Sequence, residues 1–259
     1  MIWKHYLWML SERQVSRMLN FVKAEWLKQK HSFNKVLLWL APLLTILLAF
    51  LLMGGRNLQS GAYNWWYIML LPGCFTMFST STVTREQKKN RHGLFGIAVQ
   101  KNKLWLAQII LNTLYLFSTC MIFFVGVTVG AVLFGHAITV ASSLWASVLL
   151  FVTFAWQIPL WMFITEKIGA FVAVLFSLLC NFGVAVICAV ESFWWVPFSI
   201  PARLMCSTIG VLPNGLQVEP GSEMADAAVI FPGVLITVVL YALLTIVTSL
   251  WFRKREVQS

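Results

Sequence analysis

Long apolar segments alternate with shorter polar ones along most of the chain. Six of the apolar segments carry no charge in their interior and are apolar on every side. Because a helix needs roughly 20 mostly apolar residues to cross a bilayer, each is predicted to be a membrane-spanning helix. The six predicted spans are residues 36–53, 63–84, 104–134, 143–165, 169–190 and 227–252. Strands are not expected, since these segments lack the alternating pattern of a membrane barrel.

The polar remainder of the chain divides into four parts. They are an amphipathic segment (residues 1–35), a charged loop (85–103), a long connection (191–226) and a tail (253–259). In the long connection, Pro197 and Pro201 separate pieces that are too short to span a membrane. We therefore expect a re-entrant or interfacial helical pair there. The predicted fold class is an all-α, polytopic integral membrane protein.

Composition and charge agree with a membrane protein. The 259 residues are 59% hydrophobic and 11% charged, with a mean hydropathy of +0.80, which excludes ordinary soluble and disordered chains. The net charge of +10 is typical of nucleic-acid binders. Here, however, nearly all Lys and Arg residues lie in the first polar segment, the charged loop, the link at Lys167 and the tail, and the two exceptions are Arg56 and Arg203. Since cytoplasmic segments are rich in Lys and Arg, both termini are expected in the cytoplasm of a bacterial cell, and no nucleic-acid partner is predicted.

The beginning of the sequence contains no recognisable cleavable signal peptide. Lys4 and His5 interrupt the first apolar stretch, and no small-residue cleavage site follows it. Met18 opens a second plausible amphipathic start, so the choice between Met1 and Met18 as the functional start stays open.

Residues 11–35 have the pattern of an amphipathic helix. Leu19, Trp26 and Phe33 recur every seven residues, and lysines lie around the rest of the helix. This pattern predicts a helix in the membrane interface. It either anchors the chain only or also contacts a cytoplasmic partner.

The charged loop contains a short apolar centre. Residues 94–99 are mostly apolar and lie between two basic blocks. A short apolar helix framed by charge fits a groove on a partner protein, whereas a solvated loop with some membrane contact is the alternative.

Catalytic and metal-binding motifs are missing from the sequence. It has no G-x-x-x-x-G-K-[ST], H-E-x-x-H or G-x-S-x-G, so we predict no catalytic residue and no enzyme activity. The four histidines are scattered, and no metal ligand is predicted.

The predicted spans contain few packing or polar signals. Gly126 and Gly130 form a weak GxxxG packing signal. The polar residues inside the spans are few and not ionisable, so the energy for any transport is expected to come from another chain. They include Gln108, Asn112, Gln157 and Asn181.

Several stretches together resemble a known transporter family. They are FVKAEWLKQKHSFNKVLLWLAP, TVTREQKKNRHGLF, FITEKIGAF and WWVPFSIPARLMCSTIGVLPNG. With six spans and both ends inside, they look like type-2 ABC exporter permeases. More narrowly, they are similar to the permease subunits of lantibiotic immunity ABC transporters. The resemblance covers nearly all of residues 18–255, and none of its pieces is a catalytic signature.

The resemblance implies a subunit that works with other chains. A second, related permease and two copies of an ABC ATPase are expected, and the ATPase uses ATP and Mg²⁺ while this chain holds no cofactor. In that family the loop between the second and third spans meets the ATPase. The residues that the resemblance places there or beside it are Glu86, Lys88, Lys89, Arg91, Leu94, Phe95, Glu25, Trp26 and Lys28.

The cargo implied by the resemblance is a cationic lanthionine peptide, expelled from the membrane of the cell that produces it. Acidic and aromatic side chains in or beside the long connection are the candidates to attract its charge and to hold its apolar side. They are Glu191, Glu219, Glu223, Asp226, Phe193, Trp194 and Trp195. The alternatives are a type-2 permease for another drug, a lipid or a polysaccharide, a passive channel or assembly scaffold, and a membrane-embedded enzyme.

Overall fold

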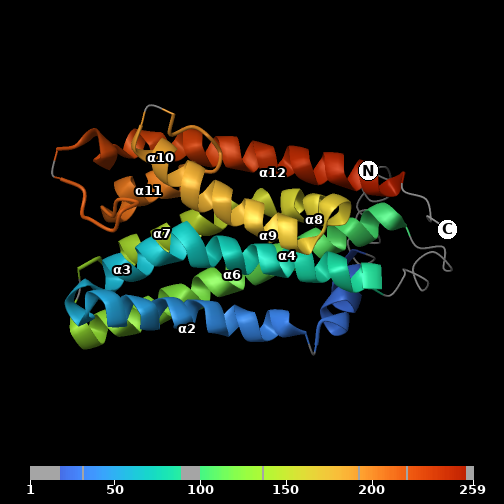
Figure 1. Cartoon of the computed structure of the whole chain (residues 1–259), viewed down its shortest axis with the longest axis horizontal. Helices are drawn as coiled ribbons and strands as arrows, with labels where there is room; N and C mark the ends of the chain where they lie inside the picture. Colours follow the sequence, from blue (N-terminus) through green and yellow to red (C-terminus); the bar gives the residue numbers. More distant parts are fainter. Residues whose placement is uncertain are drawn as a thin grey trace, which may run out of the picture.

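The computed structural model describes residues 18–30, 32–88, 100–135, 137–191, 193–219 and 221–254. The regular elements of this part of the chain are helices (Figure 1). Residues 18–28 form a helix that we call the N-terminal helix. The longer elements after it are α2 (Phe33–Met53), α3 (Leu58–Trp65), α4 (Leu71–Lys88), α6 (Lys101–Phe134), α7 (Val140–Ala155), α8 (Gln157–Ile168), α9 (Ala170–Leu178), α10 (Ala185–Val190), α11 (Ile200–Ile209) and α12 (Ile230–Arg253).

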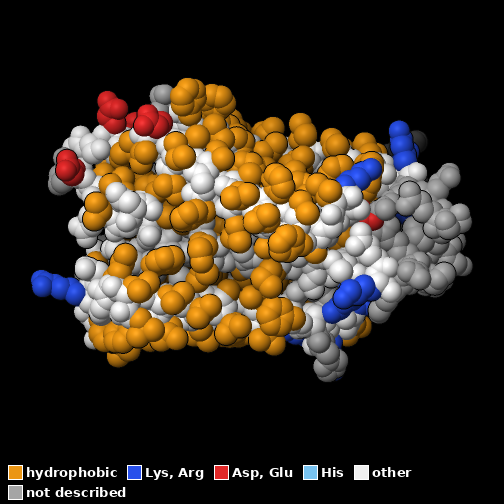
Figure 2. Space-filling model, viewed as in Figure 1, with side chains coloured by type: hydrophobic (Ala, Val, Ile, Leu, Met, Phe, Trp, Pro, Cys, Tyr) orange, Lys and Arg blue, Asp and Glu red, His pale blue; other side chains and the backbone are white. Residues whose placement is uncertain are grey.

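The long helices lie side by side and alternate in direction (Figure 1). α4, α8 and α12 finish at one end of the bundle, and α2, α6 and α9 begin there. Figure 2 shows most of the Lys and Arg side chains in view at this end, most of the Asp and Glu side chains at the other, and hydrophobic side chains along the flank between them. We call the two ends the basic end and the acidic end. This distribution is typical of a protein whose flank faces lipid.

Five helical segments are long and apolar enough to cross a membrane. They are Phe33–Met53, Lys101–Phe134, Val140–Ile168, Ala170–Val190 and Ala227–Arg253. Each coincides with one of the predicted spans to within a few residues, and the protein is a multi-pass membrane protein.

The predicted span at residues 63–84 is not among these five. It lies within a helical stretch formed by α3, a π-helical turn η2 (Trp66–Leu70) and α4. Eleven of the eighteen residues of α4 are buried, and Tyr63, Trp66 and Phe75 are fully buried. Because neighbouring helices cover much of this stretch, it needs less apolar surface than a lipid-facing helix. Six spans therefore remain a prediction.

Two features interrupt the regular α-helical segments of the bundle. α7 gives way to α8 at Trp156, and Pro159 follows inside α8, where its ring removes a backbone hydrogen bond. A second π-helical segment, η3 (Leu179–Val184), separates α9 from α10 and contacts η2.

The predicted GxxxG pair lies where α6 meets α2 and α3. A Cβ atom at Gly126 would stand 2.5 Å from Ile46 Cδ1, and one at Gly130 would stand 2.5 Å from Leu58 Cδ2. The ring of Trp66 stacks on Phe123 of α6, with centroids 4.6 Å apart. The two glycines thus serve packing within this chain.

The long connection contains a single helix of ten residues among its described residues, α11, which contacts α7, α10 and α12. Turns precede it, and an isolated antiparallel bridge joins Val211 to Gln217. Two short 3₁₀ turns, η4 (Glu223–Ala225) and η5 (Ala227–Val229), lead into α12. The predicted helical pair is therefore not confirmed. The two prolines do not separate two helices, because turns surround Pro197 and Pro201 lies in the first turn of α11.

Candidate coupling site

The N-terminal helix packs against the bundle with its polar face. Glu25 and Gln29 are each only 2% exposed, whereas Leu19 and Trp26 are exposed. Leu19 thus points away from the bundle, whereas Trp26 is exposed on one side only and also contacts α6. Phe33, the third residue of the predicted stripe, is instead the first residue of α2. An outward apolar face is what a helix at the membrane interface presents to lipid.

Two ion pairs that share Lys28 join this helix to the end of α4. Lys28 Nζ lies 2.6 Å from Glu25 Oε1 and 3.3 Å from Glu86 Oε1. Arg85 also donates a hydrogen bond to the backbone carbonyl of Lys28. Since both carboxylates are largely buried, their shared contact with Lys28 offsets part of their negative charge.

Burial and neighbouring charges shift the pKa values of Glu25 and Lys28. Burial raises the pKa of the Glu25 carboxyl, and the hydrogen bond and charge of Lys28 only partly oppose this. Burial lowers the pKa of Lys28, but Glu25 and Glu86 together outweigh it, and the pKa of Lys28 lies above its usual value. Lys28 is therefore charged throughout the physiological range.

A chain of neutral hydrogen bonds continues from the two ion pairs into the bundle. Asn34 of α2 donates to Gln29 Oε1 at 3.0 Å, and Gln29 donates to Thr82 Oγ1 of α4 at 3.1 Å. Thr82 donates in turn to Asn112 Oδ1 of α6 at 3.1 Å, and Asn112 Nδ2 lies 3.5 Å from the sulfur of Met162 in α8. The N-terminal helix is thus connected to four helices of the bundle by buried polar contacts.

Aromatic and amide contacts reinforce the same end. Trp26 lies beside Tyr115 of α6, with ring centroids 5.7 Å apart, and Lys35 Nζ lies 5.1 Å from the Trp26 ring centroid. On the other side of α4, Gln87 donates to Glu166 Oε2 of α8 at 3.1 Å. The N-terminal helix and the end of α4, with the contacts of Glu25, Lys28 and Glu86 between them, therefore form one connected unit at the basic end, which we call the joint.

The structure brings together some of the predicted coupling residues. Glu25, Lys28 and Glu86 form the two ion pairs, Trp26 lies beside them, and Lys88 lines a groove on the flank of α4. The two glutamates are buried inside the joint and do not form an outer surface. The other four lie outside the described residues: Lys89, Arg91, Leu94 and Phe95.

The predicted cargo residues lie near the acidic end. Glu191, Glu219, Glu223 and Asp226 are all exposed. Phe193 and Trp195 are exposed and 6.5 Å apart between ring centroids, whereas Trp194 packs against the hydrophobic core.

Buried Arg203 of α11 holds part of this region together. It donates from Nη2 to the backbone carbonyl of Glu223 at 2.8 Å, and its Nη1 contacts the sulfur of Met224. Asn64 of α3 fixes the turn at residues 212–216 from the other side, donating to the carbonyls of Leu212 at 3.1 Å and Pro213 at 2.9 Å.

Comparison with protein families assigns the chain. Residues 21–189 match the family described as ABC-2 family transporter protein, and this match covers more than half of the sequence. The chain belongs to this family. The comparisons with curated proteins and with solved structures find no significant match. Membrane proteins of the ABC-2 family are generally non-catalytic permeases that act with an ABC ATPase in a separate subunit.

The joint of this ABC-2 protein includes residues that the sequence analysis did not single out. Gln29, Asn34 and Thr82 are buried and carry the hydrogen bonds between the N-terminal helix, α2 and α4. A spacing of four residues, from Glu25 to Gln29 and from Thr82 to Glu86, was a usable signal, since it places polar side chains on one face of each helix.

The ABC-2 protein shows no candidate metal site within the ranges that the structure describes, where no group of three His, Cys, Asp or Glu side chains lies together. Cys74, Cys120 and Cys206 are buried there as free thiols.

Proposed function

We propose that this ABC-2 protein is the permease subunit of an ATP-driven exporter that expels a cationic lanthionine peptide from the membrane of its producer and so gives self-immunity. Its basic end faces the cytoplasm, where Lys and Arg concentrate in membrane proteins. Two copies of an ABC ATPase bind there and hydrolyse ATP with Mg²⁺, and a second, related permease completes the transport path.

The observation that carries this proposal is the bridge from Lys28 to Glu25 and Glu86. It joins the N-terminal helix to the last turn of α4, and residue 88 leads directly into the loop proposed to meet the ATPase. A displacement of that loop is then transmitted to both elements at once. Through the Asn34 and Asn112 contacts, it also reaches α2 and α6. Breaking such a buried pair on one side is costly, so the joint moves as a unit.

Exposed groups at the acidic end support the choice of cargo. Glu219, Glu223 and Asp226 are exposed acids, and Phe193 and Trp195 are exposed aromatics close to one another in sequence and space. Negative charge attracts a cationic peptide, and amphipathic aromatic rings hold apolar side chains at the membrane surface.

Co-purification tests the proposal. The chain is tagged at its C-terminus, extracted from the native membrane in mild detergent, and its partners are identified by mass spectrometry. An ABC ATPase and a second multi-pass permease are expected with the parent chain, and the ATPase is expected to be lost with Leu94→Glu/Phe95→Glu. The control is Leu216→Glu, which adds one negative charge, half of that in the double variant, at an exposed leucine near the acidic end. Recovery of the chain without any ATPase, in cells that it still protects, contradicts the exporter and favours a passive channel or scaffold.

A second measurement tests the cargo. Cells that express the complete complex are challenged with a cationic lanthionine peptide and with uncharged membrane-active drugs of similar size. Selective survival against the lanthionine peptide is expected. Survival only against the drugs assigns the same machinery to another cargo.

A further inference from the structure

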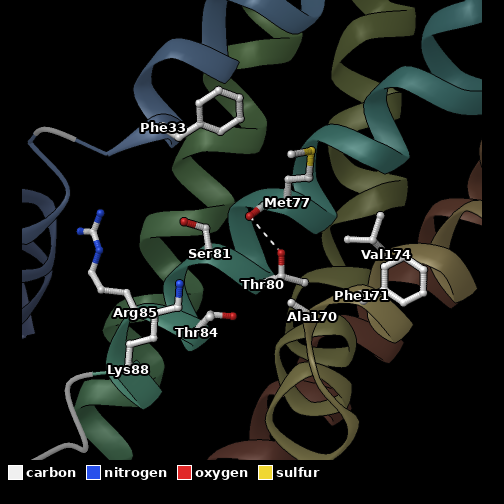
Figure 3. Close-up of a pocket in the computed structure, with 10 residues that line it drawn as sticks. All are labelled: Phe33, Met77, Thr80, Ser81, Thr84, Arg85, Lys88, Ala170, Phe171 and Val174. Carbon is white, nitrogen blue, oxygen red and sulfur yellow. Dashed lines mark hydrogen bonds between the residues drawn. The ribbon is translucent and has the colours of Figure 1, made fainter.

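A groove opens on the flank of the bundle near its basic end (Figure 3). Its floor is one face of α4, because the lining residues from Met77 to Lys88 recur at three- and four-residue spacing. Phe33 of α2 and Phe171 of α9 stand on either side of this floor. Its volume of about 700 Å³ is that of a small-ligand site.

The groove changes from cationic to apolar along its length. Arg85 and Lys88 line the part nearest the basic end, and among the described residues no carboxylate lines the groove. The hydroxyl side chains of Ser81 and Thr84 come next along α4, and Met77 follows. In Figure 3 the Lys88 side chain reaches back along α4 toward these hydroxyl groups.

The dimensions of the groove correspond to one leaflet of a bilayer. At a rise of 1.5 Å per residue, the helix from Met77 to Lys88 is about 16 Å long. Half of a hydrocarbon core of about 30 Å is about 15 Å. The groove also opens outward from the bundle, since Phe171 on its wall is 80% exposed.

Both cations have hydrogen-bonding capacity to offer. Lys88 takes part in neither of the two ion pairs formed among the described residues. Arg85 gives one N–H to the Lys28 carbonyl, and a guanidinium has five such donors. Glu86, the nearest acid in sequence, is directed to Lys28 instead of to the groove.

We propose that this groove binds an anionic glycerophospholipid from the surrounding membrane. Arg85 and Lys88 hold its phosphate, Ser81 and Thr84 donate hydrogen bonds to the headgroup, and one acyl chain lies along Met77 and the apolar side chains of α9. Charge complementarity selects a lipid with net negative charge, and the apolar half of the groove selects a lipid over a free phosphate. This inference concerns a resident lipid and is independent of the cargo.

Native mass spectrometry of the purified chain tests the inference. The detergent-solubilised protein is equilibrated with equal amounts of phosphatidylglycerol and phosphatidylcholine that carry the same acyl chains, and bound lipids are counted. Preferential retention of phosphatidylglycerol is expected. Lys88→Gln is expected to reduce this preference about fivefold, the usual effect of one basic residue near an anionic lipid surface. Ala170→Trp, which fills the groove without changing the charge, is expected to abolish it.

Two matched variants act as controls. Lys103→Gln removes a positive charge at the same end of the bundle, and Val172→Trp adds the same ring to α9; neither residue lines the groove. Both are expected to bind like the parent chain. Equal retention of the two lipids, or an equal loss in Lys88→Gln and Lys103→Gln, overturns the proposal. Displacement of the lipid by millimolar inorganic phosphate alone would indicate a phosphate site. A lipid-free dimer that Ala170→Trp dissociates would indicate that a second copy of the chain fills the groove. Either result also overturns the proposal.

Discussion

The side chains of Gln157 in α8 and Asn181 in η3 exchange two hydrogen bonds, with N–O distances of 2.8 Å and 2.9 Å. Both amides are buried, and each has a further partner. Trp161 donates to Gln157 Oε1 at 3.0 Å, and Asn181 donates to the carbonyl of Ser177 at 2.8 Å. Since hydrocarbon offers no water to an unpaired amide, this pair holds α8 and η3 together.

Removing one member of the amide pair is expected to destabilise the protein. Gln157→Leu or Asn181→Leu leaves a buried amide unsatisfied, which costs about 1–3 kcal/mol of unfolding free energy. The double variant Gln157→Leu/Asn181→Leu is expected to lose less than the sum of the two single losses, because no orphaned amide of the pair remains. Titration with a denaturing detergent measures all three.

The control for the amide pair is Gln217→Leu, which removes an exposed amide and is expected to leave the unfolding free energy within about 0.5 kcal/mol of the parent. Strict additivity of the two single variants would show that the amides act independently of each other.

Close packing at Gly130 gives a second prediction. A Cβ there would lie 2.5 Å from the side chain of Leu58, so Gly130→Ala is expected to cost about 1–3 kcal/mol of stability. Leu58→Ala alone is expected to destabilise the protein, because it removes buried contacts, but it also removes the atom that the new Cβ would meet. Gly130→Ala is therefore expected to cost less stability in the Leu58→Ala background than in the parent. Equal costs in both backgrounds would refute the contact as the cause.

The raised pKa of Glu25 predicts a pH dependence. Between its usual pKa near 4.5 and the raised value in the folded protein, the folded state binds more protons than the unfolded state. The contribution of this group to stability is therefore greatest below pH 4.5 and falls as the pH rises through the folded pKa. Glu25→Gln removes this contribution, so its melting temperature is expected to fall less than that of the parent between pH 5 and pH 8.

The exposed acid Glu219 supplies the control for this pH series. Glu219→Gln removes one carboxyl without touching the joint, and its melting curve is expected to follow the parent at each pH. A pH dependence in Glu25→Gln that equals the parent's would mean that other groups cause it.

The long apolar helices were predictable from hydropathy, whereas at the basic end the family resemblance placed Glu25, Lys28 and Glu86 in one region without predicting their contacts. The predicted spans 143–165 and 227–252 lie within the segments Val140–Ile168 and Ala227–Arg253, because the change from apolar to polar residues marks where a helix leaves hydrocarbon. Glu25 and Glu86 lie far apart in sequence, and no local pattern sets their distance from Lys28. The stripe of Leu19 and Trp26 indicated an amphipathic helix but not that its polar face is the one buried.

Neutralising the acidic end tests the role of its charges in cargo capture. The triple variant Glu219→Gln/Glu223→Gln/Asp226→Asn keeps size nearly unchanged and removes three exposed negative charges. Because such charges raise the local concentration of a cationic ligand, protection against a cationic lanthionine peptide is expected to fall severalfold at low salt and less at high salt. The minimum inhibitory concentration measures this, with Arg56→Gln, which removes a positive charge, as the opposite-sign control. Unchanged protection at every salt concentration would remove these acids from the transport path while leaving the joint at Lys28 untouched.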